Sequence, residues 1–128
     1  MSIKQRIAKR WAKRAVKATK KWAQSPIKTQ EKVLKELVKT AKNTAFGRDH
    51  DYANIKTYSD FASRVPVRDY EGLRPYVDRM VSGEEDVLWK GKPLYFSKTS
   101  GTTSGIKHIP ISKESMPTHI KVAQNALS

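Results

Sequence analysis

The apolar residues of this chain change their spacing near residue 86, and that change constrains the fold more than any other feature. Before residue 86 they recur every three or four residues, which predicts amphipathic helices. After it they alternate within short segments, which predicts strands. A chain of 128 residues suits a single domain. We therefore expect an α/β chain, more narrowly an α+β fragment, in which N-terminal helices lead into the first strands of a sheet.

Residues 1–24 predict one amphipathic helix. At about 100° per residue, its larger apolar side chains fall on one arc about 120° wide, and most of its lysines and arginines fall on the other side. The segment holds nine lysines or arginines and no acidic residue. The apolar arc consists of Ile3, Ile7, Trp11, Ala15, Ala18 and Trp22.

The net charge of +14 is concentrated in this helix, because residues 25–128 hold seventeen basic and twelve acidic residues. Three uses of the helix stay open: a solvated face of a packed helix, a weak contact with an anionic membrane, or a contact with nucleic-acid phosphates. No nucleic-acid-binding fold accompanies it, so we expect no nucleic-acid partner. The helix lacks the apolar core and cleavage site of a secretory signal, whereas a mitochondrial presequence stays open.

Residues 25–47 predict a second helix. Ser25 stands at the N-cap and Pro26 at the first helical position. The stretch from Asn43 to Gly47 is expected to end the helix, with Gly47 as its stop, and the turn-forming residues 48–57 predict a loop. The stripe expected to be buried consists of Val33, Leu34, Leu37, Val38 and Ala41.

Two shorter helices follow, each with a recognisable start. Thr57 and Asp60 have the spacing of a capping box. Asp69 is expected to cap the next helix, which Pro75 interrupts and Gly83 ends.

Three short apolar segments then predict strands, at residues 86–89, 93–98 and 106–111. After the third, Ser112 is expected to cap a helix over residues 113–128.

The seven residues 99–105 are all threonine, serine or glycine, and they lie between two predicted strands. Hydroxyls and backbone N–H groups of a glycine-rich turn can converge on an anion, and Lys107 adds positive charge. The Walker pattern is excluded, because three residues separate Gly101 from Gly105 and the next element is a strand. A hairpin connection rich in turn formers has the same composition, so composition alone leaves both interpretations open.

The order of residues in this loop resembles the phosphate loop of the adenylate-forming enzymes. Their usual pattern is Thr-Ser-Gly-Thr-Thr-Gly, two residues, then Lys-Gly, and the stretch from Ser100 to Lys107 keeps its Ser-to-Lys spacing. Ser104 stands where the second glycine is usual, and Ile106 and His108 replace the usual proline and glycine beside the lysine. With these departures the chain resembles the auxin-responsive-promoter family of acyl-acid amido synthetases, in its bacterial form. The segments that carry the match are NTAFG, RVPVRDYEGLRPYV and SGTTSGIKHIP.

This resemblance implies a ligase that uses ATP to convert a small carboxylic acid into an acyl-adenylate. An amine acceptor, such as an amino acid, would then take the acyl group. Lys107 would assist the phosphates, or it would be a solvated strand lysine. The residues that would bind the β and γ phosphates by analogy are Ser100, Gly101, Thr102, Thr103, Ser104 and Gly105.

The resemblance also implies a longer enzyme, whose adenine-binding segment, acyl pocket and C-terminal domain would lie downstream. We therefore expect an N-terminal fragment that is inactive alone. It would comprise the basic helix 1–24 and a partial adenylation domain over residues 25–128. Within that domain, residues 25–85 would be helical, residues 86–112 would hold the strands and the phosphate loop, and the truncated helix would follow.

Metal, redox and membrane features are few. Mg²⁺ is implied as the companion of ATP, but Glu114, the acidic residue nearest to the loop, is expected to be a helix first-turn charge. The chain has no cysteine, so disulfides and thiolate metal sites are excluded. No apolar run reaches the length of a membrane span, and we expect a cytoplasmic location.

Overall fold

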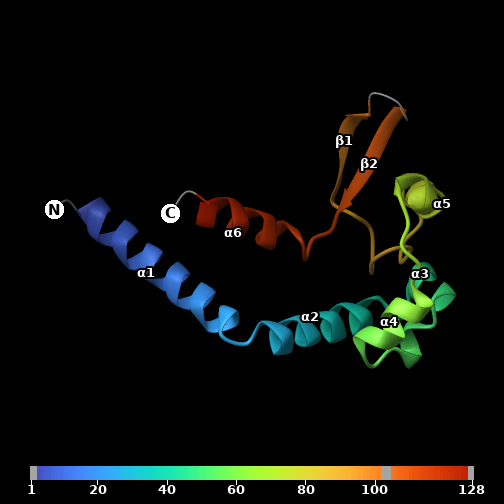
Figure 1. Ribbon diagram of the computed structural model, residues 1–128. Helices are drawn as coiled ribbons and strands as arrows, with labels where there is room; N and C mark the ends of the chain where they lie inside the picture. Colours follow the sequence, from blue (N-terminus) through green and yellow to red (C-terminus); the bar gives the residue numbers. More distant parts are fainter. Residues whose placement is uncertain (1–2, 102–104, 127–128) are drawn as a thin grey trace.

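The computed structural model describes residues 3–101 and 105–126, and it shows helices followed by a small sheet, as the change of spacing predicts (Figure 1). Among these residues, no helix combines the length and the apolar character needed to cross a bilayer. The elements are α1 (Ile3–Ala23), α2 (Pro26–Ala41), α3 (Ala45–Asp49), the 3-10 helix η1 (Tyr52–Asn54), α4 (Tyr58–Arg64), α5 (Tyr70–Val81), β1 (Tyr95–Gly101), β2 (Gly105–Ile111) and α6 (Met116–Ala126).

The first two helices form a long arm, and only the far end of α2 is buried (Figure 1). Pro26 occupies the first turn of α2 as predicted, although Ser25 makes no side-chain cap hydrogen bond. Val38 and Ala41 are buried, each 5% exposed. Val33 and Leu37 belong to the same predicted stripe, but about half of each side chain is exposed.

The expected stop at Gly47 is wrong, because α2 ends at Ala41, whereas the loop expected over residues 48–57 is correct apart from the end of α3 and the short η1. Thr44 turns the chain: its hydroxyl donates to the Ala41 carbonyl at 2.7 Å and accepts from the Gly47 N–H at 3.0 Å. A new helix, α3, starts at once, and Gly47 lies inside it. A Cβ at position 47 would overlap the Ala41 carbonyl, so glycine is needed there for a close approach of two backbones.

The strand predicted at residues 86–89 is also wrong. The chain there forms a closed loop, in which the Gly91 N–H donates to the Asp86 carboxylate at 2.7 Å and the Asp86 N–H donates to the Gly91 carbonyl at 3.2 Å. The carbonyls of Asp86 and Val87 accept the N–H groups of Ala45 and Phe46, at 2.7 and 3.0 Å. Those N–H groups belong to the first turn of α3 and have no acceptor within the helix. The carbonyls of the loop therefore bond to them and not to a neighbouring strand.

The core of the described residues is small and lies where α3, α5 and this loop meet. Its buried members are Ala45, Met80 and Val87, and Val87 is fully buried. Tyr76, Leu88 and Phe96 pack against them. Because Phe96 lies on β1, the same cluster fixes one end of the hairpin to the helices.

The predicted starts of α4 and α5 are confirmed, and the predicted break at Pro75 is not. Thr57 and Asp60 form the capping box of α4, and the Asp69 side chain accepts the Gly72 N–H at the start of α5. Helix α5 continues through Pro75 to Val81. Proline removes only one backbone hydrogen bond there, and burial of Val77 and Met80 beyond it stabilises the continuation.

Candidate functional site

Strands β1 and β2 form an antiparallel hairpin, and the described residues of the serine–glycine–threonine run lie where β1 ends and β2 begins (Figure 1). Gly101 faces Gly105 across the hairpin, so residues 102–104 connect the two strands. Gly105 has φ +76°, in the left-handed region, and a Cβ there would meet no atom within 4 Å. Glycine is therefore needed at this position for its backbone conformation and not for space.

The predicted site residues divide into two groups. Ser100 and Gly101 end β1, and Gly105 and Lys107 lie at the start of β2. The other three, Thr102, Thr103 and Ser104, lie outside the residues that the structure describes.

Tyr70 holds β2 against α5, and sequence reasoning did not single it out. Its hydroxyl accepts the His108 N–H at 2.8 Å and lies 3.4 Å from the His108 carbonyl, to which it donates. It follows directly after the cap residue Asp69, so the start of α5 fixes its position. The hydroxyl thus covers a backbone donor on the edge of β2 that does not pair with β1. No sequence pattern predicts a contact between residues 38 positions apart.

Two cations lie near the Tyr70 ring. The Lys107 ammonium lies 5.4 Å from the ring centroid and the Arg74 guanidinium lies 5.2 Å from it, both within the range of cation–π attraction. Arg74 also donates two hydrogen bonds to the Glu71 carboxylate, at 2.7 and 2.8 Å. These bonds are the main reason why the pKa of Glu71 is lowered, and the charge of Lys107 contributes.

Lys107 therefore has a defined environment on β2, opposite Thr99 and beside α5. Its side chain is half-buried, which differs from a freely solvated strand lysine. The ring and the carboxylate of Glu71 hold a positive charge two residues beyond Gly105. This arrangement can add a cation to an anion bound at the turn, and it can equally serve to dock the hairpin on α5.

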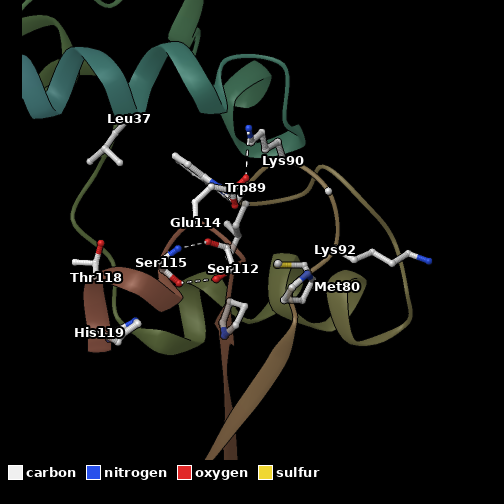
Figure 2. Close-up of a pocket in the computed structure, with 14 residues that line it drawn as sticks. Leu37, Met80, Trp89, Lys90, Lys92, Ser112, Glu114, Ser115, Thr118 and His119 are labelled. Carbon is white, nitrogen blue, oxygen red and sulfur yellow. Dashed lines mark hydrogen bonds and ion pairs between the residues drawn. The ribbon is translucent and has the colours of Figure 1, made fainter. Parts of the chain in front are cut away.

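A pocket of about 510 Å³ lies at the other end of the hairpin (Figure 2). It is bounded by the end of β2, the start of α6, the loop around Trp89 and one side of α2, where Leu37 lies. The Glu114 carboxylate accepts from the Trp89 indole N–H at 3.2 Å and pairs with Lys90 at 3.3 Å. Figure 2 shows these groups beside one another.

Glu114 does not have the place expected for it in the first turn of a helix, because α6 starts later than predicted, at Met116. Ser112 accepts the Ser115 N–H at 3.1 Å and so closes a turn before the helix. The pKa of Glu114 is lowered, mainly by the N–H of its own backbone and further by Lys90 and Trp89. An ionised, paired carboxylate of this kind orders the chain around the pocket and is not set up as a proton donor.

Comparisons with known proteins give one consistent result. The sequence model of a family described as the GH3 family N-terminal domain matches residues 15–128. The chain is 42% identical over 45 residues to a probable indole-3-acetic acid-amido synthetase, GH3.13, of Oryza sativa subsp. japonica, covering 35% of the chain and 10% of the relative. It is 38% identical over 63 residues to the indole-3-acetic acid-amido synthetase GH3.15 of Arabidopsis thaliana, covering 48% of the chain and 11% of the relative.

A solved structure agrees with these sequence matches. The acyl acid amido synthetase AtGH3.15, solved in complex with 2,4-DB, matches 73% of this chain with a TM-score of 0.65 and 27% sequence identity. The match covers 17% of that chain. The present chain thus spans about a tenth of the length of the curated relatives that it matches.

Proposed function

This chain belongs to the GH3 family, and from that membership we propose that it forms the beginning of an ATP-dependent acyl acid amido synthetase. In the proposed reaction, a carboxylate oxygen of the acid attacks the α-phosphorus of ATP, and pyrophosphate leaves. An amine, such as that of an amino acid, then attacks the acyl carbon, and AMP leaves with the electrons of the broken C–O bond. The products are an amide, AMP and pyrophosphate.

The proposed division of the chain has two parts. Residues 1–24 form a basic helix, and residues 25–128 form the first part of the adenylation domain. The family match begins at residue 15, inside α1, so the family sequence pattern covers all of the second part and residues 15–24 of the first. Because the reaction consumes ATP, we place the protein in the cytoplasm.

The observation that carries the proposal is the β1–β2 hairpin, which has its connection at the hydroxyl-rich run between two glycines. Backbone N–H groups and hydroxyls are the donors that phosphate oxygens accept, so the residues fit the β and γ phosphates of ATP. The proposed role of Ser100, Gly101, Gly105 and the residues between them is to position the pyrophosphate and to stabilise its growing charge. ATP supplies the activated phosphorus and the leaving group.

Mg²⁺ would accompany the nucleotide, and we assign no residue to it. Among the described residues, no group of three or more His, Asp or Glu side chains is placed to hold a metal ion. The phosphates would then be the main ligands of the ion, as is common for Mg²⁺. Every step assigned to this chain accordingly rests on hydroxyl and backbone donors and on the charge of Lys107.

The experiment is ATP–pyrophosphate exchange that depends on an added carboxylic acid, measured with the protein purified from its natural source and with variants made in the same gene. Ser100→Ala and Thr102→Ala should each slow exchange about 10- to 100-fold, because each removes a donor to the phosphates. Lys107→Ala should have a smaller effect, because the Tyr70 ring and Glu71 already share its charge.

Ser97→Ala is the matched control, since it removes an exposed hydroxyl from the same strand, three residues before Ser100. It should leave exchange within about twofold of the unaltered protein. Exchange that is equally fast in all four variants would remove the hairpin from the mechanism. Absence of any acid-dependent exchange in the unaltered protein would overturn the proposed activity itself.

A further inference from the structure

None of the described residues of α1 is buried, which contrasts with α2 and α5 and is shared with the described residues of α6. The connection of α1 to the rest of the chain runs through the turn at residues 24–25, after which α2 begins. Figure 1 shows it as an arm that extends away from α3, α4 and α5. Just over half of α1, its residues 3–14, also lies outside the part of the chain that matches the family. Its pattern therefore needs an explanation other than the packing of the family domain.

The helix separates its charge from its apolar surface. Seven of its nine cations fall between about 180° and 300° around the helix axis, whereas the apolar arc spans the adjoining sector, from about 300° to 60°. The other two cations, Lys4 and Arg14, fall within the arc. The arc is open to solvent: Ile3 is 77% exposed, Ile7 63% and Trp22 54%. Trp11 is the most covered of the arc's large side chains, and it lines a shallow hollow with Met116 and Ile120 of α6.

We propose that α1 is a membrane-surface helix, which lies on an anionic lipid bilayer with its apolar arc in the interface and its cations at the headgroups. Helices of this kind have a polar, Lys/Arg-rich face, an apolar face with Trp and Leu-like side chains, and low net hydrophobicity. Tryptophan favours the interface because its ring is apolar and its N–H is polar. The absence of any acid in residues 1–24 gives full charge complementarity to phosphatidylserine or a similar lipid.

A nucleic acid fits this helix less well than a bilayer does. Phosphates would use the cationic face, but nucleic acid would leave the arc of Ile3, Ile7 and Trp22 in water. A bilayer uses both faces at once. The contact is independent of the proposed ligase activity, and it would place the enzyme beside a membrane without changing its chemistry.

The test is co-sedimentation of the 128-residue chain with vesicles of equal parts phosphatidylcholine and phosphatidylserine, and with vesicles of phosphatidylcholine alone. We expect binding to the anionic vesicles only, weakening as salt is raised because the attraction is screened. Ile7→Ser should weaken binding about tenfold through lost apolar burial. Lys13→Glu combined with Lys17→Glu should weaken it tenfold or more, since about fivefold is expected for each charge removed near the surface.

Two control variants match these changes outside α1. Val67→Ser removes an exposed apolar side chain, and Lys35→Glu combined with Lys39→Glu reverses two charges with the same spacing on α2. Both should stay within about twofold of the unaltered chain. The emission of Trp22 should shift to shorter wavelength on the anionic vesicles, and Trp22→Phe should lose that part of the shift.

Four results would overturn the proposal. One is the absence of binding to anionic vesicles, and another is equal binding to neutral ones. The third is a control variant that weakens binding as much as the α1 variants do. The fourth is tighter binding to double-stranded DNA that is insensitive to Ile7→Ser, which would assign the helix to nucleic-acid phosphates.

Discussion

Two regions of the molecule are stabilised in different ways. One is helix α1, and the other is the contact between α3, α5 and the loop at residues 86–91. The second region is small but closed: Val87 is fully buried, and backbone groups of α3 pair directly with the loop. In α1 no described residue is buried, and the main contact of its apolar arc outside the helix is the shallow hollow that Trp11 lines with α6. Most helices in proteins gain their stability chiefly from packing of an amphipathic face, and α1 has little such packing.

The difference between the two regions predicts which substitutions will lower stability and which will alter binding. In the closed region a side chain cannot change without disturbing a neighbour far away in the sequence, so changes should alter stability. In α1 a change meets water, so it should alter what the helix binds and leave the rest of the fold intact. The predictions below test the closed region and its surroundings, and the pair of Met80 and Ile7 variants compares it directly with α1.

The largest effect is expected from Gly47→Ala. Its Cβ would overlap the carbonyl of Ala41, a backbone atom that cannot move without shifting the junction of α2 and α3. We expect the free energy of unfolding to fall by about 3 kcal/mol or more. Urea unfolding followed by circular dichroism measures it.

Gly83→Ala is the control for that change. Gly83 has φ +95°, but a Cβ there would meet no atom within 4 Å, so the substitution adds backbone strain of about 1–2 kcal/mol and no clash. Equal losses in the two variants would show that the close approach at Gly47 is not what holds α3.

Met80→Ala tests the core more gently. Met80 is 4% exposed and packs with Ala45 and Val87. It also lines the pocket near α6, so the space left by truncation opens into existing volume and we expect a loss of about 2–3 kcal/mol. Ile7→Ala in α1 removes a similar apolar volume. Apart from the change in helix propensity, it should lower the free energy of unfolding by less than about 0.5 kcal/mol. If both variants lose the same stability, α1 is packed in solution and the comparison fails.

The sequence predicts the local features of the fold but not those that depend on residues far apart in the chain. Thr57, Asp60 and Asp69 were predicted correctly as caps because capping depends on residues three positions apart. Gly47 and Val87 were misread because their roles depend on the Ala41 carbonyl and on the N–H groups at the start of α3. A glycine at a backbone contact and a glycine at a helix end look alike in one sequence.

The features of the candidate site also divide into those that the sequence predicts and those that it does not. The hairpin and its glycine–serine–threonine connection were predictable from alternation and from the resemblance to adenylate-forming enzymes. The support of the hairpin by Tyr70 was not, because the phenol and His108 are 38 positions apart and no spacing rule joins them. The phosphate-binding role of residues 100–105 and of Lys107 stays a prediction.

Tyr70→Phe tests that support with a smaller effect. It leaves the ring under Lys107 and Arg74 but removes the hydroxyl that accepts the His108 N–H. We expect a loss of about 1 kcal/mol and faster hydrogen exchange at the His108 amide. Tyr58→Phe is the control, because Tyr58 is 72% exposed. Unchanged exchange at His108 would mean that α5 does not hold the edge of β2.

Acid titration should produce the smallest effect, and it separates α1 from α4 by chemistry. The pKa of Asp60 is lowered, mainly because its carboxylate accepts the Lys56 N–H and further because it bonds to Thr57. Since the folded pKa lies below the unfolded value, the stabilisation is complete above the unfolded pKa and is lost as the pH falls through the folded pKa. Asp60→Asn keeps an acceptor oxygen but no charge, so the gap between its urea midpoint and that of the unaltered chain should narrow as the pH falls from about 7 to about 3.

Residues 1–24 contain no carboxylate, so the same titration should leave the residue-level helix signals of α1 unchanged while those of α4 weaken. Amide chemical shifts recorded across the titration measure both helices in one sample. If α1 loses its helical signals together with α4, the two helices unfold as a unit. The charged arm would then owe its structure to contacts with the rest of the chain, and its exposed apolar arc would have to be explained by those contacts.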